Sequence, residues 1–152
     1  MSQTKRTVAY APASIGNVSL GFDVLGAALE PIDGSILGDE VIIETASNYG
    51  LTVSGPFAHK LPQDPATNIV THCYHYFAEQ AKAQGISVTP VHIELKKNLP
   101  IGSGIGSSAS SIVAALHGLN AHFDEPFERD ALLLIMGELE GQISGSIHYD
   151  NV

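Results

Sequence analysis

The stretch LPIGSGIGSSASS, residues 99–111, places three glycines at alternate positions directly before a segment with helical character. Glycine lets the backbone adopt positive φ and approach a ligand closely, because it has no Cβ. A helix that begins after such a loop adds unpaired N–H groups and roughly half a positive charge at its first turn. Phosphate groups bind at such helix starts, so the stretch predicts a phosphate-binding loop. An ordinary glycine-rich turn in which Ser107 caps the helix is the alternative.

Strands are expected in the first two thirds of the chain. β-branched residues cluster between turn signals in three places, and these predict strands at residues 7–11, 39–45 and 87–97. Residues 12–38 hold five glycines and are expected to loop, with an extended segment at residues 22–29. The third strand leads directly into the glycine loop.

Helices are expected mostly in the second half. Helical spacing of apolar residues predicts them at residues 68–84, 107–122 and 128–140. The last of these is so apolar that we expect it to be buried on all sides. Because strands come early and helices late, an α+β two-layer sandwich fits better than an alternating parallel sheet. With no internal repeat or low-complexity linker, residues 1–152 are interpreted as one domain.

Composition limits the classes of partner. Sixteen acidic residues against seven Lys and Arg give a formal charge of −9, which disfavours nucleic acid and anionic membranes. An anionic ligand would therefore need backbone amides and a divalent cation. Cys73 is the only cysteine, so no internal disulfide can form, and no apolar stretch is long enough for a signal peptide or a membrane span. These features predict a cytoplasmic protein.

Other phosphate-loop and nucleophile motifs fit less well. A Walker loop would need Gly-Lys-Ser/Thr after its glycines, and a Gly-x-Ser-x-Gly nucleophile elbow does not occur. Gly104-x-Gly106-x-x-Ala109 does match the dinucleotide fingerprint, with Asp124 or Glu125 at a suitable spacing for a ribose hydroxyl. A dinucleotide-binding domain therefore stays open as an alternative.

The string PIGSGIGSSA, residues 100–109, resembles the second signature of the GHMP kinases, Pro-x-x-x-Gly-x-Gly-Ser-Ser-Ala. The stretches at residues 11–17 running into 21–26, and 137–141 running into 148–152, are similar to the homoserine branch of that superfamily, so the resemblance covers essentially the whole chain. It implies the N-terminal, ATP-binding domain of such a kinase, a two-layer fold of the ribosomal protein S5 domain 2 type. The implied activity is ATP- and magnesium-dependent phosphorylation of the side-chain hydroxyl of L-homoserine to O-phospho-L-homoserine, a step of threonine biosynthesis.

The resemblance implies roles for residues that contact ATP and magnesium (Mg²⁺). Ser108 and Glu140 would hold the metal, which prefers hard oxygen ligands, whereas Glu138 would point elsewhere on the same helix. Asn68 and Lys96 would contact adenine, although a helix cap and a solvated strand end explain them equally well. The residues implied to wrap the phosphates are Pro100, Ile101, Gly102, Ser103, Gly104, Ile105, Gly106, Ser107, Ser108, Ala109 and Ser110.

Further positions correspond to the substrate side of the family's site. The resemblance implies that Asn17, Asp23 and His148 contact the amino acid, with Asp23 suited to its ammonium group. Asn151 corresponds to an aspartate that mevalonate kinase-like relatives use as a base. An amide cannot accept the proton as a base would, so we expect Asn151 to orient the hydroxyl for transfer through a loose transition state.

Two features of the family pattern are missing. The third signature, a second glycine-rich loop, and the arginines expected to bind the substrate carboxylate do not occur. We therefore expect an incomplete N-terminal portion that is inactive alone, and a nucleotide- or metabolite-binding module without turnover is the alternative. Unpaired strand edges would favour a homo-oligomer.

Overall fold

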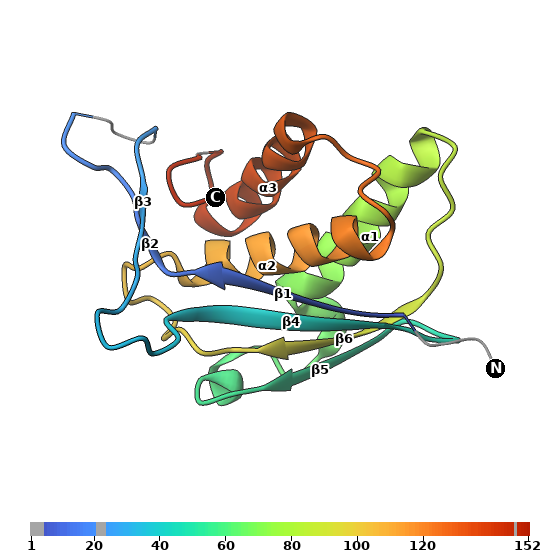
Figure 1. Cartoon of the computed structure of the whole chain (residues 1–152), viewed down its shortest axis with the longest axis horizontal. Coiled ribbons are helices and arrows are strands. Elements are labelled where there is room, and N and C mark those ends of the chain that lie inside the picture. Colours follow the sequence, from blue (N-terminus) through green and yellow to red (C-terminus); the bar gives the residue numbers. More distant parts are fainter. Residues whose placement is uncertain (1–4, 21–23, 148) are drawn as a thin grey trace.

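A four-stranded sheet is covered on one face by helices in the computed structural model, which describes residues 5–20, 24–147 and 149–152 (Figure 1). The strand order is β1-β4-β6-β5, in which β1 pairs with β4 and β4 with β6 in antiparallel fashion, whereas β5 is parallel to β6. The expected α+β architecture is thus confirmed. The strands are β1 (Arg6–Pro12), β4 (Gly38–Thr45), β5 (Gly50–Ser54) and β6 (Val91–Lys96).

The predicted strands at residues 7–11 and 39–45 are confirmed, and the third is shorter than expected. It begins at Val91 rather than at residue 87, consistent with Pro90, which has no N–H to donate to a ladder. The sequence missed β5 and the short ribbon of β2 (Ser14–Ile15) with β3 (Ala27–Ala28). Only two residues of the extended segment predicted at residues 22–29 are strand, and residues 21–23 lie outside the described residues.

Alternation along the strands separates a buried face from an outer face. Val91, Ile93 and Leu95 of β6 are fully buried and face the helices, together with Val41 and Ile43 of β4. Their partners in the core include Phe77, Leu116 and Leu119. The outer face of β6 consists of His92, Glu94 and Lys96.

The three predicted helices are present, as α1 (Ile69–Ala83), α2 (Ser107–His122) and α3 (Arg129–Ser144), with two short 3₁₀ turns, η1 (Ala58–Lys60) and η2 (Pro65–Thr67). Helix α2 lies directly on β1 and β4, and α3 packs on α2 (Figure 1). Within the described residues, no helix is long and apolar enough to cross a membrane.

Helix α3 is not buried on all sides, contrary to the sequence-based expectation. Leu132, Ile135, Met136 and Leu139 are buried, but Leu134 is 57% exposed, because α3 contacts its neighbours through one side only. The helix continues four residues beyond the expected end, to Ser144, and Gly145 follows with a φ of +86 as a left-handed cap.

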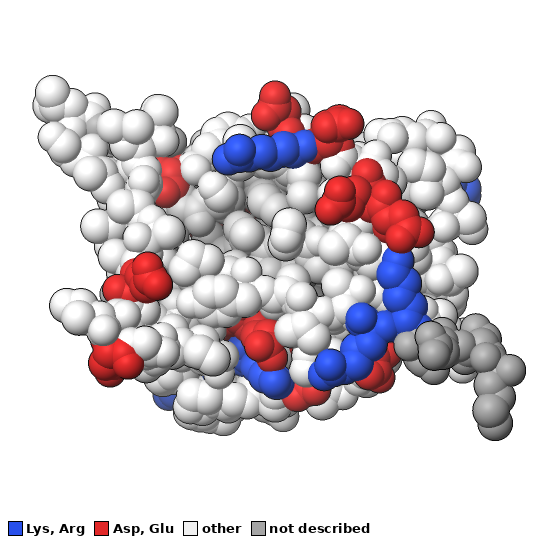
Figure 2. Space-filling model, in the orientation of Figure 1, with Lys and Arg blue, Asp and Glu red and all other residues white. Residues whose placement is uncertain are grey.

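The surface between α2 and α3 is hollowed, with apolar residues in its wall and Glu125, Glu128 and Arg129 at one part of it. A cavity of about 630 Å³ lies there, with Val113, Leu132, Leu133 and Met136 in its wall. On the face shown in Figure 2, charged side chains lie around an uncharged central area over α2 and β1. A contact between copies would bury apolar area of this kind, and the homo-oligomer stays a prediction.

Candidate functional site

The glycine loop connects β6 to α2 and has the expected backbone conformation. Gly102, Gly104 and Gly106 have φ values of +72, +76 and +67, which side chains with a Cβ rarely adopt. Gly106 occupies the position before α2 and offers no side-chain cap. Ser107 is already the first helical residue, and its hydroxyl donates to the carbonyl of Leu99 at 3.3 Å. The expected role of Ser107 as the helix cap in the alternative interpretation is therefore wrong.

The glycines face different surroundings. Apart from the adjacent residues of the loop, no atom of the described residues lies within 4 Å of the position that a Cβ would take at Gly102 or Gly104, so the middle of the loop is open to a ligand. A Cβ at Gly106 would instead lie 2.5 Å from Ser14 Oγ and 3.2 Å from Asn151 Nδ2. Gly106 thus allows a close approach between the loop and two other segments.

A cavity of about 560 Å³ opens beside the loop, within the range usual for small-molecule sites. It lies between the loop, the start of α1 and the end of α3, and its wall is mostly apolar with a few polar groups. Such a wall suits a flat heterocycle joined to a polar tail. The residues lining it are Leu61, Pro62, Thr67, Asn68, Ile69, Lys97, Ile101, Gly102, Ser103, Gly104, Gly106, Ser107, Ser108, Ser111 and Ile143.

Asn68 lines this cavity and is only 2% exposed. Its Oδ1 accepts a hydrogen bond from the N–H of Val70 at 2.9 Å and so caps α1. Its Nδ2 is buried and has no hydrogen-bond partner among the described residues. Leaving a buried donor unsatisfied costs about 1–3 kcal/mol, so an acceptor on a ligand would stabilise this arrangement.

Ser108 and Glu140, which are 32 positions apart in the sequence, meet beside the loop. Ser108 Oγ donates to Glu140 Oε1 at 2.7 Å, and Glu140 is 5% exposed in the last turns of α3. No group of three or more His, Cys, Asp or Glu side chains in the described part of the chain could hold a metal by itself. One hydroxyl and one carboxylate fit Mg²⁺, which usually takes one or two protein ligands and the rest from phosphate and water.

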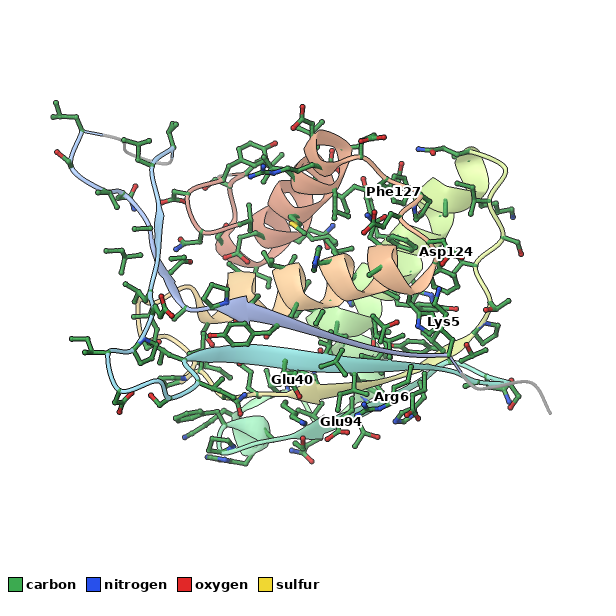
Figure 3. All side chains as sticks on the ribbon, viewed as in Figure 1. Lys5, Arg6, Glu40, Glu94, Asp124 and Phe127 are labelled. Carbon is green, nitrogen blue, oxygen red and sulfur yellow. The ribbon has the colours of Figure 1, made fainter. Side chains whose placement is uncertain are left out.

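The two lysines before the loop point to opposite sides of the sheet. Lys96 lies on the outer face, where its Nζ is 2.6 Å from Glu40 Oε1, and it does not line the cavity. Figure 3 shows Glu40 on the sheet, away from the helix layer. This geometry does not support the expected adenine contact of Lys96. Lys97 does line the cavity, buried against Asp39 with 2.5 Å between Nζ and Oδ2.

Lys97 and Asp39 are site residues that the sequence reasoning missed, although a signal was present. Lys97 continues the inward alternation of Val91, Ile93 and Leu95, so its charge falls on the buried side of the chain. Burial lowers the pKa of Lys97, and the neighbouring carboxylates of Asp39 and Glu140 oppose that shift.

Asn151, predicted to orient the substrate hydroxyl, lies near the end of the loop, and Asn17, a predicted substrate contact, is bound to the neighbouring Asp150. Asn151 Nδ2 donates to Ser14 Oγ at 2.9 Å, while the N–H of Ser14 donates to the carbonyl of Ile105 at 3.0 Å. The N–H of Asn17 donates to Asp150 Oδ2 at 2.9 Å. Sequence reasoning missed Ser14 and Asp150.

Gly16 and Gly26 let these segments meet. A Cβ at Gly16 would lie 2.1 Å from Asp150 Oδ2, and one at Gly26 would lie 1.5 Å from the carbonyl oxygen of Asp150. Another cavity, of about 340 Å³, lies beside this contact and is lined in part by Ser14, Gly26, Asp150 and Asn151. The other two predicted substrate residues, Asp23 and His148, lie outside the described residues.

The dinucleotide alternative fails on geometry. Asp124 and Glu125 follow the last residue of α2, and a 16-residue helix separates them from the glycine loop by about 24 Å. Asp124 instead pairs with Lys5 at 2.7 Å, at the end of α2 farther from the loop (Figure 3). No acidic group of this pair could reach a ribose bound beside the loop.

Comparison with known proteins identifies the family. A family model described as the GHMP kinases N terminal domain matches residues 68–152. A homoserine kinase structure from Cytophaga hutchinsonii is 34% identical with a TM-score of 0.79, covering 100% of this chain and 46% of that one. The chain belongs to the GHMP kinase family and has the fold of its N-terminal domain.

Two further structures show the same fold at lower identity. A putative homoserine kinase from Listeria monocytogenes is 22% identical (TM-score 0.66), covering 97% of this chain and 46% of that one. The galactokinase from Lactococcus lactis, complexed with galactose, is 15% identical (TM-score 0.63), with 97% and 39% covered. The chain therefore spans less than half the length of these kinases.

Proposed function

We propose that the protein carrying this chain phosphorylates the side-chain hydroxyl of L-homoserine with ATP and Mg²⁺, giving O-phospho-L-homoserine for threonine biosynthesis. The observation that carries the proposal is that three features of the site meet at the glycine loop. Three glycines with positive φ precede α2, the Ser108–Glu140 pair lies beside them, and Asn151 reaches the loop's last glycine. The 34% identity to a homoserine kinase supports the choice of substrate within the family.

In this proposal the nucleotide lies along the cavity beside the loop. The open backbone at Gly102 and Gly104 and the first turn of α2 would bind the phosphates, because unpaired N–H groups and the helix dipole favour anions there. Asn68 Nδ2 would donate to a ring nitrogen of adenine. Ser108 Oγ and Glu140 Oε1 would hold Mg²⁺, which neutralises charge on the phosphates when it is bound.

Phosphoryl transfer forms a bond between the substrate hydroxyl oxygen and the γ-phosphorus and breaks the bond to the bridging oxygen, so that ADP leaves. Asn151 would orient the hydroxyl, and because its amide cannot take up the proton, the hydroxyl proton would pass to an oxygen of the transferred phosphoryl group. The rate then depends on alignment and on stabilisation of the transferred group by the loop and α2. Asn17, Asp23 and His148 would contact the amino acid by resemblance.

The proposal is tested by ADP release with three acceptors: homoserine, mevalonate and galactose. The protein assayed should contain this chain together with the half that the homoserine kinase structures have beyond it. Homoserine should be turned over fastest. Equal or faster turnover of either other acceptor would contradict the substrate assignment, and ADP release with none of the three would contradict the kinase assignment.

A nucleotide-binding module without turnover is the second candidate, favoured by one observation: the chain spans 46% of the homoserine kinase structure. The two candidates differ in activity. The module would bind ATP whether or not the second half were attached and would never release ADP in response to homoserine.

A further inference from the structure

Asp39 lies at the start of β4, has no exposed surface and accepts four hydrogen bonds. Its Oδ1 accepts from the backbone N–H of Asn98 at 2.8 Å and of Leu99 at 3.1 Å. Its Oδ2 accepts from Lys97 Nζ at 2.5 Å and from Ser111 Oγ at 2.6 Å. Both oxygens of the carboxylate are therefore fully used by protein donors.

These contacts join the two ends of the glycine loop. Asn98 and Leu99 enter the loop, whereas Ser111 belongs to the first turns of α2, which leaves it. Lys97 adds a second connection, because its Nζ also donates to the carbonyl of Ser107 at 2.7 Å. One carboxylate on another strand thus fixes where the loop begins and where it ends.

Lys97 has no donor left for a ligand in this arrangement. An ammonium group has three N–H donors, and here they match three protein acceptors: Asp39 Oδ2, Ser107 O and Ser111 Oγ at 3.0 Å. The lysine lines the cavity, but its charge is directed at the protein. It differs in this respect from a Walker lysine, which reaches the phosphates themselves.

The middle of the loop cannot hold its own shape by packing. In the part of the chain that the structure describes, no residue other than the adjacent ones lies within 4 Å of the side-chain positions at Gly102 and Gly104, and glycine is the most flexible residue in an unfolded chain. The conformation is therefore set by the two ends together with two hydrogen bonds to carbonyls within residues 100–106, from Ser103 Oγ to the carbonyl of Pro100 at 2.6 Å and from the N–H of Ser14 to the carbonyl of Ile105 at 3.0 Å. Stability alone does not account for a buried Lys–Asp pair, because apolar residues of similar size often stabilise a core equally well.

We propose that Asp39 and Lys97 are positioning residues that set the separation and direction of the two ends of the glycine loop and so aim its amides at the ATP phosphates. The identity of the ligand in this inference rests on the proposed function, whereas the geometry of the two loop ends does not. Misplacing a binding group by about 1 Å can cost about 100-fold in rate, so the effect on a nucleotide complex is large enough to measure.

The test compares three variants of the chain with matched controls. Asp39→Asn and Lys97→Met each leave the other charged residue of the pair buried without its partner. The double variant removes both charges, so no unpaired charge stays buried. Lys5→Met and Asp124→Asn remove an exposed Lys–Asp pair of similar length, 2.7 Å, at the other end of α2. Circular dichroism first selects a temperature at which every variant is folded.

Two readouts are then taken: the affinity for ATP with Mg²⁺ by calorimetry, and the NMR order parameters of residues 100–106 without nucleotide. We expect the double variant to bind ATP about 10-fold to 100-fold more weakly and the loop order parameters to fall from about 0.85 toward 0.6. The Lys5 and Asp124 variants should match the wild type in both.

The outcomes separate the inference from the proposed function. A loop that stays rigid in the folded double variant, or a double variant that binds ATP as well as the wild type, would overturn the positioning role. A wild-type protein with both halves that does not bind ATP would overturn the proposed function, while the order parameters would still decide whether Asp39 and Lys97 set the loop conformation.

Discussion

Replacing Glu140 with glutamine tests the proposed metal ligand while sparing the local structure. Glutamine has nearly the same size, and its Oε1 can still accept the 2.7 Å hydrogen bond from Ser108. The carboxylate lies near the C-terminus of α3, where the helix dipole disfavours negative charge by about 0.3–1 kcal/mol at exposed sites. The substitution should therefore lower the free energy of unfolding by no more than about 1 kcal/mol.

The effect on the rate should be much larger. Loss of one key electrostatic contact in an active site costs on the order of 10²–10³ in kcat, equivalent to about 2.7–4 kcal/mol. We expect kcat for homoserine to fall by that factor in a protein that includes the second half, and half-saturation to require more magnesium. ADP release measured against magnesium concentration gives both numbers, and thermal unfolding gives the stability.

Glu138→Gln is the matched control on the same helix. Glu138 is exposed, lies two residues away, and accepts a hydrogen bond from Tyr76 OH instead of from Ser108. That hydrogen bond is the main cause of the raised pKa of Tyr76, about 12, so the control should lower the pKa of Tyr76 without changing kcat. An unchanged kcat and magnesium dependence in Glu140→Gln would refute the metal role.

Three further predictions follow from the described contacts. Gly106→Ala places a Cβ 2.5 Å from Ser14 Oγ on a left-handed backbone, whereas Gly102→Ala carries the backbone strain alone. Gly106→Ala should therefore weaken ATP binding and lower the free energy of unfolding by more than the strain itself, which is about 1–2 kcal/mol. Equal unfolding midpoints for the two variants would count against the close contact. Asn68→Asp keeps the cap on α1 but removes the donor in the cavity, so ATP affinity should fall about tenfold with little change in melting temperature; unchanged affinity would exclude an adenine contact. Burial lowers the pKa of His122 below its usual 6.5, so the folded state favours the neutral ring and loses stability as pH falls below about 6.5; urea unfolding at pH 7.5 and 5.0 should show a loss that is smaller in His122→Gln, and equal losses would refute it.

The glycine loop was predictable because its information is local. Alternate glycines, a proline before them and a helical pattern after them are all visible within residues 99–122, and the positive φ values follow from the glycines themselves. The three helices were predictable for the same reason, since apolar spacing is a property of each segment. Strand β5 was missed because its five residues, GLTVS, offer too short a pattern.

Contacts between distant segments could not be read from local pattern. The hydrogen bond from Ser108 to Glu140 crosses 32 positions, and only the resemblance to the GHMP kinases, through a shared metal ion, implied that these residues lie together. Asp39 and Lys97 each follow the inward alternation of their own strand, which a reader could have noticed. That they meet depends on the antiparallel pairing of β4 with β6, which is a property of the whole sheet.

The central claim, that ATP phosphates bind at the glycine loop, is tested most directly by NMR titration of the chain with ATP and magnesium. We predict that the largest shifts will fall on the backbone amides of residues 102–108 and on the side-chain amide of Asn68. ADP should cause smaller shifts than ATP for those amides that would lie next to the γ-phosphate. Shifts centred instead on Asp124 and Glu125, or no saturable shifts at all, would contradict the account.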